Sequence, residues 1–239
     1  MNEHVKEANK KRIEAIIKNL ETRNMSGYYC ETAEDAKNKI LSMISEGDLV
    51  SWGGSASLDE LGIKKELKNV LDGTAPSKEE ALENRRKAFM ADVYLTGTNA
   101  VTMDGELVNI DKTGNRVAAM CFGPKKVIVV AGINKIVENE DAAVGRIRTE
   151  ACVPNAIRLG LMTPCAVTGK CAHCLGQSMC CYTVTTRASA IKDRIHIILV
   201  NKFYIYIITF NVLIIFIVLV LTILASILIF LGEIGRASC

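Results

Sequence analysis

Residues 3–201 alternate between segments with the apolar spacing of helices and segments with that of strands. The helical spacing predicts helices over 3–22, 33–45, 78–90, 115–122 and 138–160, the last broken near Pro154. Apolar runs predict strands over 25–30, 48–52, 92–95, 126–131 and 194–200. Residues 101–103 and 107–110 flank Asp104-Gly105, which predicts a hairpin. Strands that alternate with helices indicate an α/β domain with a largely parallel sheet covered on both faces.

The pattern changes abruptly after residue 201, because residues 203–231 contain no charged side chain. As a helix this run is about 43 Å long, enough to cross a bilayer, and would anchor a cytoplasmic domain in the membrane. The alternative is a read-through artefact. The run has the Ile, Phe, Tyr and Asn content of AT-rich DNA, and its final EIGRASC back-translates to the start of a common sequencing adapter. We favour the artefact, and divide the chain into a domain over 1–201 and a tail over 202–239.

The composition and net charge argue against several classes of protein. The net charge of +3 gives no support to a nucleic-acid binder, and three histidines are too few for a His-rich metal centre. The N-terminus is charged throughout and lacks the apolar core of a secretory signal, which favours a cytoplasmic location. The nine cysteines are therefore expected as free thiols or metal ligands rather than disulfides.

A glycine turn follows the strand predicted over 48–52, in the sequence SWGGSASLDELG. Ligands of open α/β sheets bind at such strand ends. Gly53 and Gly54 would let the backbone approach an anion, Ser55 would add a hydroxyl, and Ser57 with Glu60 resembles a helix start. The alternative is a tight turn with no ligand. The adjacent Trp52 is interpreted as a core or rim aromatic.

A second polar segment, over 96–119, gathers six side chains that are expected to face a pocket: Asn99, Asp104, Asn109, Asp111, Asn115 and Arg116. Asp111 is the candidate general base or orienting group for a hydroxy acid or sugar-like substrate. Arg116 is the candidate clamp for a carboxylate or phosphate. The alternative is ordinary turn chemistry, and Asp104 in the hairpin is interpreted that way.

Five of the cysteines fall in the loop predicted over 163–182: Cys165, Cys171, Cys174, Cys180 and Cys181. Cys171 and Cys174 form a close pair, and Cys165 with either Cys180 or Cys181 would complete four thiolates for Zn²⁺ or an iron–sulfur cluster. The spacing is neither that of a ferredoxin nor that of a two-pair zinc ribbon. His173 is expected to be solvated. Reduced thiols without a metal are the alternative, whereas Cys30, Cys121 and Cys152 are expected as buried small hydrophobes.

Three segments together resemble the LUD domain, the family of lactate-utilisation proteins, in its stand-alone form. They are SWGGSASLDELG, DVYLTGTNAVTMDGELVNIDKTGNRVAAMCFGPKKVIVVAGINKIV and TPCAVTGKCAHC, and the resemblance covers about residues 5–200. It implies a three-layer, Rossmann-like fold similar to the ribose-5-phosphate isomerase, glucosamine-6-phosphate deaminase and CoA-transferase group. It also places Gly53, Gly54, Ser55, Asn99, Asn109, Asp111, Gly114, Asn115 and Arg116 in the pocket.

The resemblance further implies a role in the oxidation of L-lactate, or a similar hydroxy acid, to pyruvate, with redox partner proteins and an iron–sulfur cluster or zinc on the cysteines. Two alternatives stay open: a non-catalytic binding or assembly subunit with a structural zinc loop, and an enzyme like the sugar-phosphate isomerases. This sequence departs from the family pattern at LGQSMCC, which leaves the fourth thiolate ambiguous, and after Asn201, where the apolar run begins.

Overall fold

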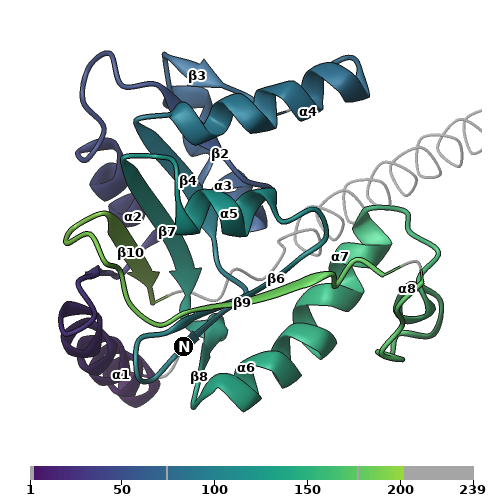
Figure 1. Ribbon diagram of the computed structural model, residues 1–239. Helices are drawn as coiled ribbons and strands as arrows, with labels where there is room; N and C mark the ends of the chain where they lie inside the picture. The colour runs from purple at the N-terminus through teal and green to yellow at the C-terminus, as the bar shows by residue number, and fades with distance from the viewer. Residues whose placement is uncertain (1–2, 74, 177, 202–239) are drawn as a thin grey trace, which may run out of the picture. The chain divides into compact units, whose positions relative to one another are not determined.

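The computed structural model describes residues 3–73, 75–176 and 178–201, and its centre is a six-stranded sheet (Figure 1). In spatial order the strands are β1 (Ser26–Cys30), β10 (Ile195–Val200), β7 (Lys126–Gly132), β4 (Val93–Gly97), β2 (Val50–Trp52) and β3 (Val70–Leu71). Every neighbouring pair is parallel. The predicted α/β class is therefore confirmed, and the last strand along the chain lies next to the first.

Helices cover both faces of this sheet (Figure 1). On one face α1 (Glu3–Glu21), α4 (Lys78–Lys87) with the short helix η2 (Ala88–Met90), and α5 (Asn115–Cys121) lie over the strands, with α2 (Ala33–Leu41) and α3 (Ala56–Leu61) on the other. Strand β7 is buried on both faces, as expected for a central parallel strand. Its Val127 and Val129 pack with Ile13 and Ile16 of α1 in one apolar core. The three-layer arrangement follows from that two-sided burial.

A second, four-stranded sheet was not predicted, although its central hairpin was. Its spatial order is β8 (Ile136–Val137), β5 (Ala100–Thr102), β6 (Leu107–Asp111) and β9 (Tyr182–Thr186). Strands β5 and β6 pair antiparallel through Gly105, whose φ of 86° is one that glycine adopts without strain. Strand β9 escapes sequence analysis because it is largely exposed at one edge and lacks an apolar run.

The segment predicted as one helix over 138–160 differs from expectation in where it breaks. It consists of α6 (Glu140–Arg146), a π-helical stretch (Ile147–Ala151) and α7 (Cys152–Arg158), so Pro154 lies inside a helix. Proline has no N–H for the carbonyl four residues earlier. The backbone widens just before it, and the N–H of Cys152 bonds to the carbonyl of Ile147, five residues back. The irregular turn turns out to border a cavity.

Smaller departures concern helix ends and surface residues. Thr32 and Asp35 form a capping box at the start of α2, and Ser55, not the expected Ser57, caps α3. Cys121 is exposed, so the prediction of Cys121 as a buried hydrophobe was wrong. The remaining short elements are η1 (Ile63–Glu66), η3 (Ile133–Lys135) and α8 (Pro164–Thr168).

The apolar tail over 202–239, including the membrane span expected over 203–231, lies outside the described residues. Within the described part of the chain, no helix combines the length and the apolar character that a bilayer crossing requires.

Candidate functional site: a strand-end pocket and a thiol cavity

Most of the polar residues predicted as a pocket meet at the carboxyl ends of β2, β4 and β6. Arg116, in the first turn of α5, is the centre of this group. Its Nη1 donates to Asn109 Oδ1 at 2.6 Å, and its Nη2 to Asn99 Oδ1 at 3.0 Å. Its Nε donates to Asp111 Oδ1 at 2.8 Å, and its Nη2 also pairs with that oxygen. The structure thus brings Asn99, Asn109, Asp111 and Arg116 into one hydrogen-bonded network.

Protein groups accept hydrogen bonds from all three guanidinium nitrogens of Arg116. The guanidinium also donates to the carbonyls of Gly97 and Ile110, at 3.3 and 3.2 Å. The side chains of Arg116 and Asp111 are only 11% and 10% exposed, and the other carboxylate oxygen of Asp111 accepts the N–H of Val117 at 3.1 Å. A guanidinium bonded in this way holds the loops around it in place, and its donors reach a ligand only by giving up protein acceptors.

The glycine turn lies against this network. A Cβ on Gly53 would lie 2.9 Å from the hydroxyl of Tyr94 and 3.2 Å from Cγ of Arg116, so glycine is required there by close packing. A Cβ on Gly54 would meet no atom within 4 Å, so the turn opens to solvent at that residue. Ser55 is half-buried and caps α3. The turn therefore has one side packed on the network and one side accessible to a ligand.

Two of the predicted pocket residues have structural roles at the rim. Gly114 begins α5 with a φ of 78°, and a side chain there would press on the ring of Tyr182 at 3.3 Å. Asn115 accepts a hydrogen bond from Thr113 Oγ1 at 2.6 Å. Trp52 is half-buried, with the Lys64 ammonium 5.4 Å from its ring centroid, as expected for a rim aromatic. Asp104 lies in the hairpin turn, as interpreted from the sequence.

The sequence interpretation missed Lys135 at this site. Lys135 follows β7 in η3, and its Nζ donates to Ser57 Oγ at 3.0 Å. Burial lowers the pKa of Lys135 to about 8, and the nearby charges of Arg146 and Arg116 act in the same direction. The only signal in the sequence was its place directly after a buried strand, where ligand-binding residues gather.

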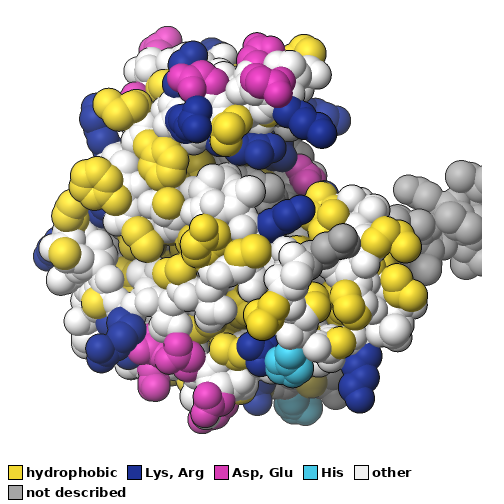
Figure 2. Space-filling view, turned by 45° about the vertical axis from the view of Figure 1, so that its right-hand side comes forward, with side chains coloured by type: hydrophobic (Ala, Val, Ile, Leu, Met, Phe, Trp, Pro, Cys, Tyr) yellow, Lys and Arg dark blue, Asp and Glu magenta, His cyan; other side chains and the backbone are white. Residues whose placement is uncertain are grey.

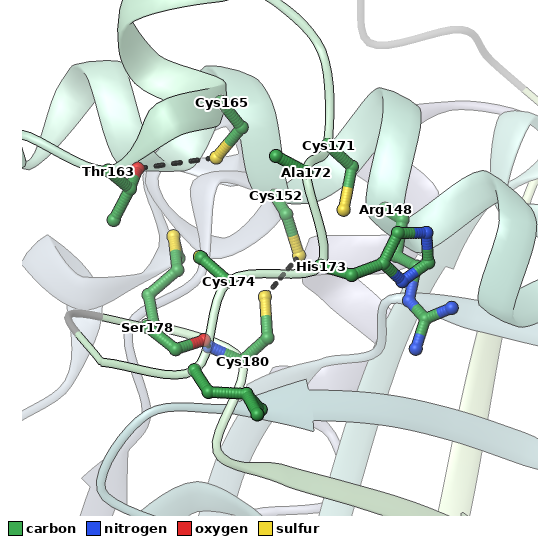
Figure 3. Close-up of a pocket in the computed structure, with 12 residues that line it drawn as sticks. Arg148, Cys152, Thr163, Cys165, Cys171, Ala172, His173, Cys174, Ser178 and Cys180 are labelled. Carbon is green, nitrogen blue, oxygen red and sulfur yellow. Dashed lines mark hydrogen bonds between the residues drawn. The ribbon is translucent and has the colours of Figure 1, made fainter.

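The cysteines line a separate cavity of about 210 Å³ between α7, α8 and the loop before β9 (Figure 3). Its lining contains five thiols: Cys152, Cys165, Cys171, Cys174 and Cys180. Figure 3 shows the sulfur atoms of Cys152 and Cys180 turned toward one another, with Arg148 and His173 at one side. Cys181 is exposed and bonds to the carbonyl of Ser178 instead. The structure thus places Cys180 in the cavity lining and Cys181 outside it.

Cys152 is the residue that sequence analysis assigned to the core. It is buried, as expected, but its Sγ lies 3.5 Å from that of Cys180. This hydrogen bond, and after it the charge of Arg148, lowers the pKa of Cys180 to about 7. The same bond and burial raise the pKa of Cys152. Of the two thiols, Cys180 is therefore the one that loses its proton more readily.

The chemistry of these donors suits a thiophilic metal. Two sulfurs bound to one zinc lie about 3.8 Å apart, given Zn–S bonds of about 2.3 Å at tetrahedral angles. The pair of Cys152 and Cys180 is already near that spacing. Among the described residues no three His, Cys, Asp or Glu side chains are arranged to coordinate one ion. Cys165, whose Sγ bonds to Thr163 Oγ1 at 3.2 Å, and the Cys171/Cys174 pair would have to turn inward.

Comparison with models of known protein families identifies the family of this chain. The model of the family described as LUD domain matches residues 13–200. No curated protein matches the chain.

Solved structures add matches of low identity. A DUF162 family protein from Deinococcus radiodurans aligns with a TM-score of 0.49 and 15% identity, over 81% of this chain and 98% of that one. Ribose 5 phosphate isomerase A from Neisseria gonorrhoeae aligns with a TM-score of 0.30 and 16% identity, over 45% and 56%. The eIF2B-beta2-delta2 complex from C. thermophilum gives 0.31 and 21%, over 44% and 41%.

Proposed function

The chain belongs to the LUD domain family, which makes it a lactate-utilisation-related protein, and we propose that it takes part in oxidising L-lactate or a similar 2-hydroxy acid to pyruvate. In this proposal the strand-end pocket binds the acid and the thiol cavity holds an iron–sulfur cluster. Zinc is the alternative metal, and a partner protein would then have to accept the electrons directly. The observation that carries the proposal is the gathering of five thiols around one cavity. Thiolates are the ligands that zinc and iron–sulfur clusters share.

The strand-end pocket suits a small organic anion. Arg116, Arg146 and Lys135 bring three cationic groups to it. The carboxylate of Asp111 pairs with Arg116 and that of Glu150 with Arg146, whereas Glu60 acts on Lys135 at longer range. The Asp111 carboxylate has both oxygens engaged by Arg116 and by the backbone of Val117. Asp111 would therefore act by orienting Arg116, the second of the roles expected for it. The Lys135 ammonium, whose hydrogen-bond partner is the hydroxyl of Ser57 rather than a carboxylate, favours an anionic ligand.

Oxidation of a 2-hydroxy acid to a 2-oxo acid removes two electrons and two protons, so an electron acceptor is required. An iron–sulfur cluster, when bound, accepts and passes on single electrons. Four of the thiols of Cys152, Cys165, Cys171, Cys174 and Cys180 would hold it, and a redox partner protein would take the electrons onward. Around the cavity Met162, Val167 and Leu175 are 77%, 66% and 93% exposed, an apolar rim that such a partner can cover. Figure 2 shows hydrophobic side chains on the right-hand surface, where this part of the chain lies.

The test begins with the full-length protein, purified without oxygen. We would record its visible absorption, quantify iron, sulfide and zinc, and assay electron transfer from L-lactate to an artificial acceptor. Iron with sulfide, a colour bleached by dithionite, and lactate-dependent reduction would support the proposal. A protein without any bound metal and without lactate-dependent reduction would contradict it.

Since every cysteine among the described residues is a free thiol, we expect a cytoplasmic location.

A second candidate is a non-catalytic binding or assembly subunit with a structural zinc. The spacing of Cys152 and Cys180, 3.5 Å between sulfurs, favours it because it is close to the edge of a zinc tetrahedron. In that case the protein would be colourless and hold one zinc, and removal of the zinc would lower its thermal stability. Lactate-dependent reduction would then be absent.

A further inference from the structure

The cations at the strand-end pocket differ in how many of their hydrogen-bond donors the protein uses. Arg116 is satisfied by the network described above. Arg146 is also engaged, because its Nε donates to the carbonyl of Asn134 at 2.9 Å and its Nη1 to that of Asn99 at 2.7 Å. Arg146 further pairs with Glu150 at 3.7 Å. Both arginines therefore act on the loops that they join.

Lys135 is different. An ammonium has three N–H donors, and within the described chain one of them bonds to Ser57 Oγ at 3.0 Å. No carboxylate of the described residues lies within ion-pair distance of it, although Glu60 on α3 exerts a longer-range attraction. A half-buried ammonium with donors to spare is a group that gains from an anionic partner.

A glycine lets Ser55 and Lys135 lie together over the end of β4. Gly97 ends β4, and a Cβ built there would lie 2.7 Å from Ser55 Oγ and 3.5 Å from Lys135 Nζ. A side chain on Gly97 would thus displace the Ser55 hydroxyl, and we call this meeting of a hydroxyl and an ammonium beside Gly97 the cradle. The glycine turn at Gly54 leaves the neighbouring side open to solvent. The cradle has donors, positive charge and an entrance.

We propose that Lys135, with the hydroxyls of Ser55 and Ser57, binds the anionic group of the ligand in the cradle beside Gly97, and that Arg116 is a positioning residue. The inference rests on the proposed function, in which that anionic group is the carboxylate of a hydroxy acid. An ammonium flanked by two hydroxyls also suits a phosphate, because both ligands present oxygen acceptors to the same donors. The oxyanion is therefore the shared chemistry, and binding experiments separate its two sources.

The experiment measures equilibrium binding of L-lactate and, separately, of inorganic phosphate to the full-length protein by calorimetry. Lys135→Met removes the charge, and Gly97→Ala displaces the Ser55 hydroxyl while the charge stays. Lys18→Met, on the exposed side of α1, is the matched control for loss of one lysine. We expect both site variants to weaken binding by at least about tenfold, and the control to bind as the original protein does. Thermal unfolding of each variant verifies that it is folded.

The outcomes separate this inference from the proposed function. Binding of lactate that is lost in Lys135→Met supports both. Binding of phosphate but not lactate, lost in the same variant, supports the cradle and overturns the hydroxy-acid proposal. Unchanged binding of either anion in a folded Lys135→Met variant overturns the role of Lys135 and leaves the proposed function standing. Failure of the original protein to bind either anion overturns both.

Discussion

The strand-end pocket and the thiol cavity are built in opposite ways. The pocket lies at the ends of buried parallel strands, and its central side chains are held by hydrogen bonds before any ligand arrives. The cavity lies between a π-helical turn, two short helices and an irregular loop. Its thiols have one close Sγ–Sγ contact among them, between Cys152 and Cys180.

This difference indicates which of the two sites needs its ligand to fix the arrangement of its side chains. A polar network with every member satisfied is rigid without help. Thiols on a loop gain a fixed arrangement when a metal draws them together, so that metal binding supplies folding energy locally. We therefore expect the pocket to be preorganised and the cavity to be completed by its metal.

The largest effect should come from breaking the network. Arg116→Ala leaves Asp111, Asn99 and Asn109 without their shared donor at a largely buried site. Removing one partner of a buried ion pair costs about 3–5 kcal/mol, and we expect a loss of that size in the free energy of unfolding in urea. Arg148→Ala, at the thiol cavity, should cost less than about 1 kcal/mol in the metal-free protein. Equal losses in the free energy of unfolding in the two variants would contradict the view that the pocket is preorganised and the cavity is not.

A smaller effect, on metal binding, should distinguish Cys152 on α7 from Cys181 in the loop before β9. We expect Cys152→Ser to weaken metal binding by at least about tenfold, since even the outer partners of metal ligands contribute 10–100-fold. Cys181→Ser should leave metal content unchanged, because that thiol lies outside the cavity. Titration of zinc against a competing chelator measures both. Loss of zinc from Cys181→Ser with retention by Cys152→Ser would show that the cavity of Figure 3 is not the metal site.

The two sites also differ in how far the sequence predicted them. The strands of the large sheet are apolar runs. Asn99 follows β4 of that sheet, whereas Asn109 and Asp111 lie on β6 of the small sheet and Arg116 on α5. Their short spacing after a buried strand indicated a common site, although β6 pairs antiparallel in a sheet that was not predicted. What the pattern could not give was the saturation of Arg116, since hydrogen-bond partners depend on three-dimensional geometry.

At the thiol cavity the sequence located four of the five lining cysteines because they are neighbours in the chain. Cys152 was missed because it lies on a helix and is buried, as a structural cysteine would be. Its approach to Cys180 depends on the π-helical turn before it, and no local pattern predicts that turn. Lys135 was missed for a similar reason, because its partner Ser57 is distant in the sequence.

The smallest effect concerns pH and the pocket alone. Lys135 faces Ser57 and Glu60 from α3, Arg116 from α5 and Arg146 from α6. Burial lowers its pKa to about 8, so the ammonium is mostly charged at pH 7 and mostly neutral at pH 9. An oxyanion bound by the charged form should therefore lose affinity by about tenfold between these pH values. L-Lactate keeps the same charge throughout that range, so it is the anion to use in this series.

Calorimetry at pH 7, 8 and 9 measures this loss, and the variant Lys135→Arg is its control. An arginine does not titrate below pH 12, so any binding that this variant retains should be flat across the series. At pH 8 the original protein should also take up a proton as it binds, because a bound anion raises the pKa of the ammonium. That uptake appears as a dependence of the binding enthalpy on the ionisation enthalpy of the buffer. A flat profile in the original protein would mean that the anion is held by groups other than Lys135, and the preorganised pocket would then owe its charge to the arginines.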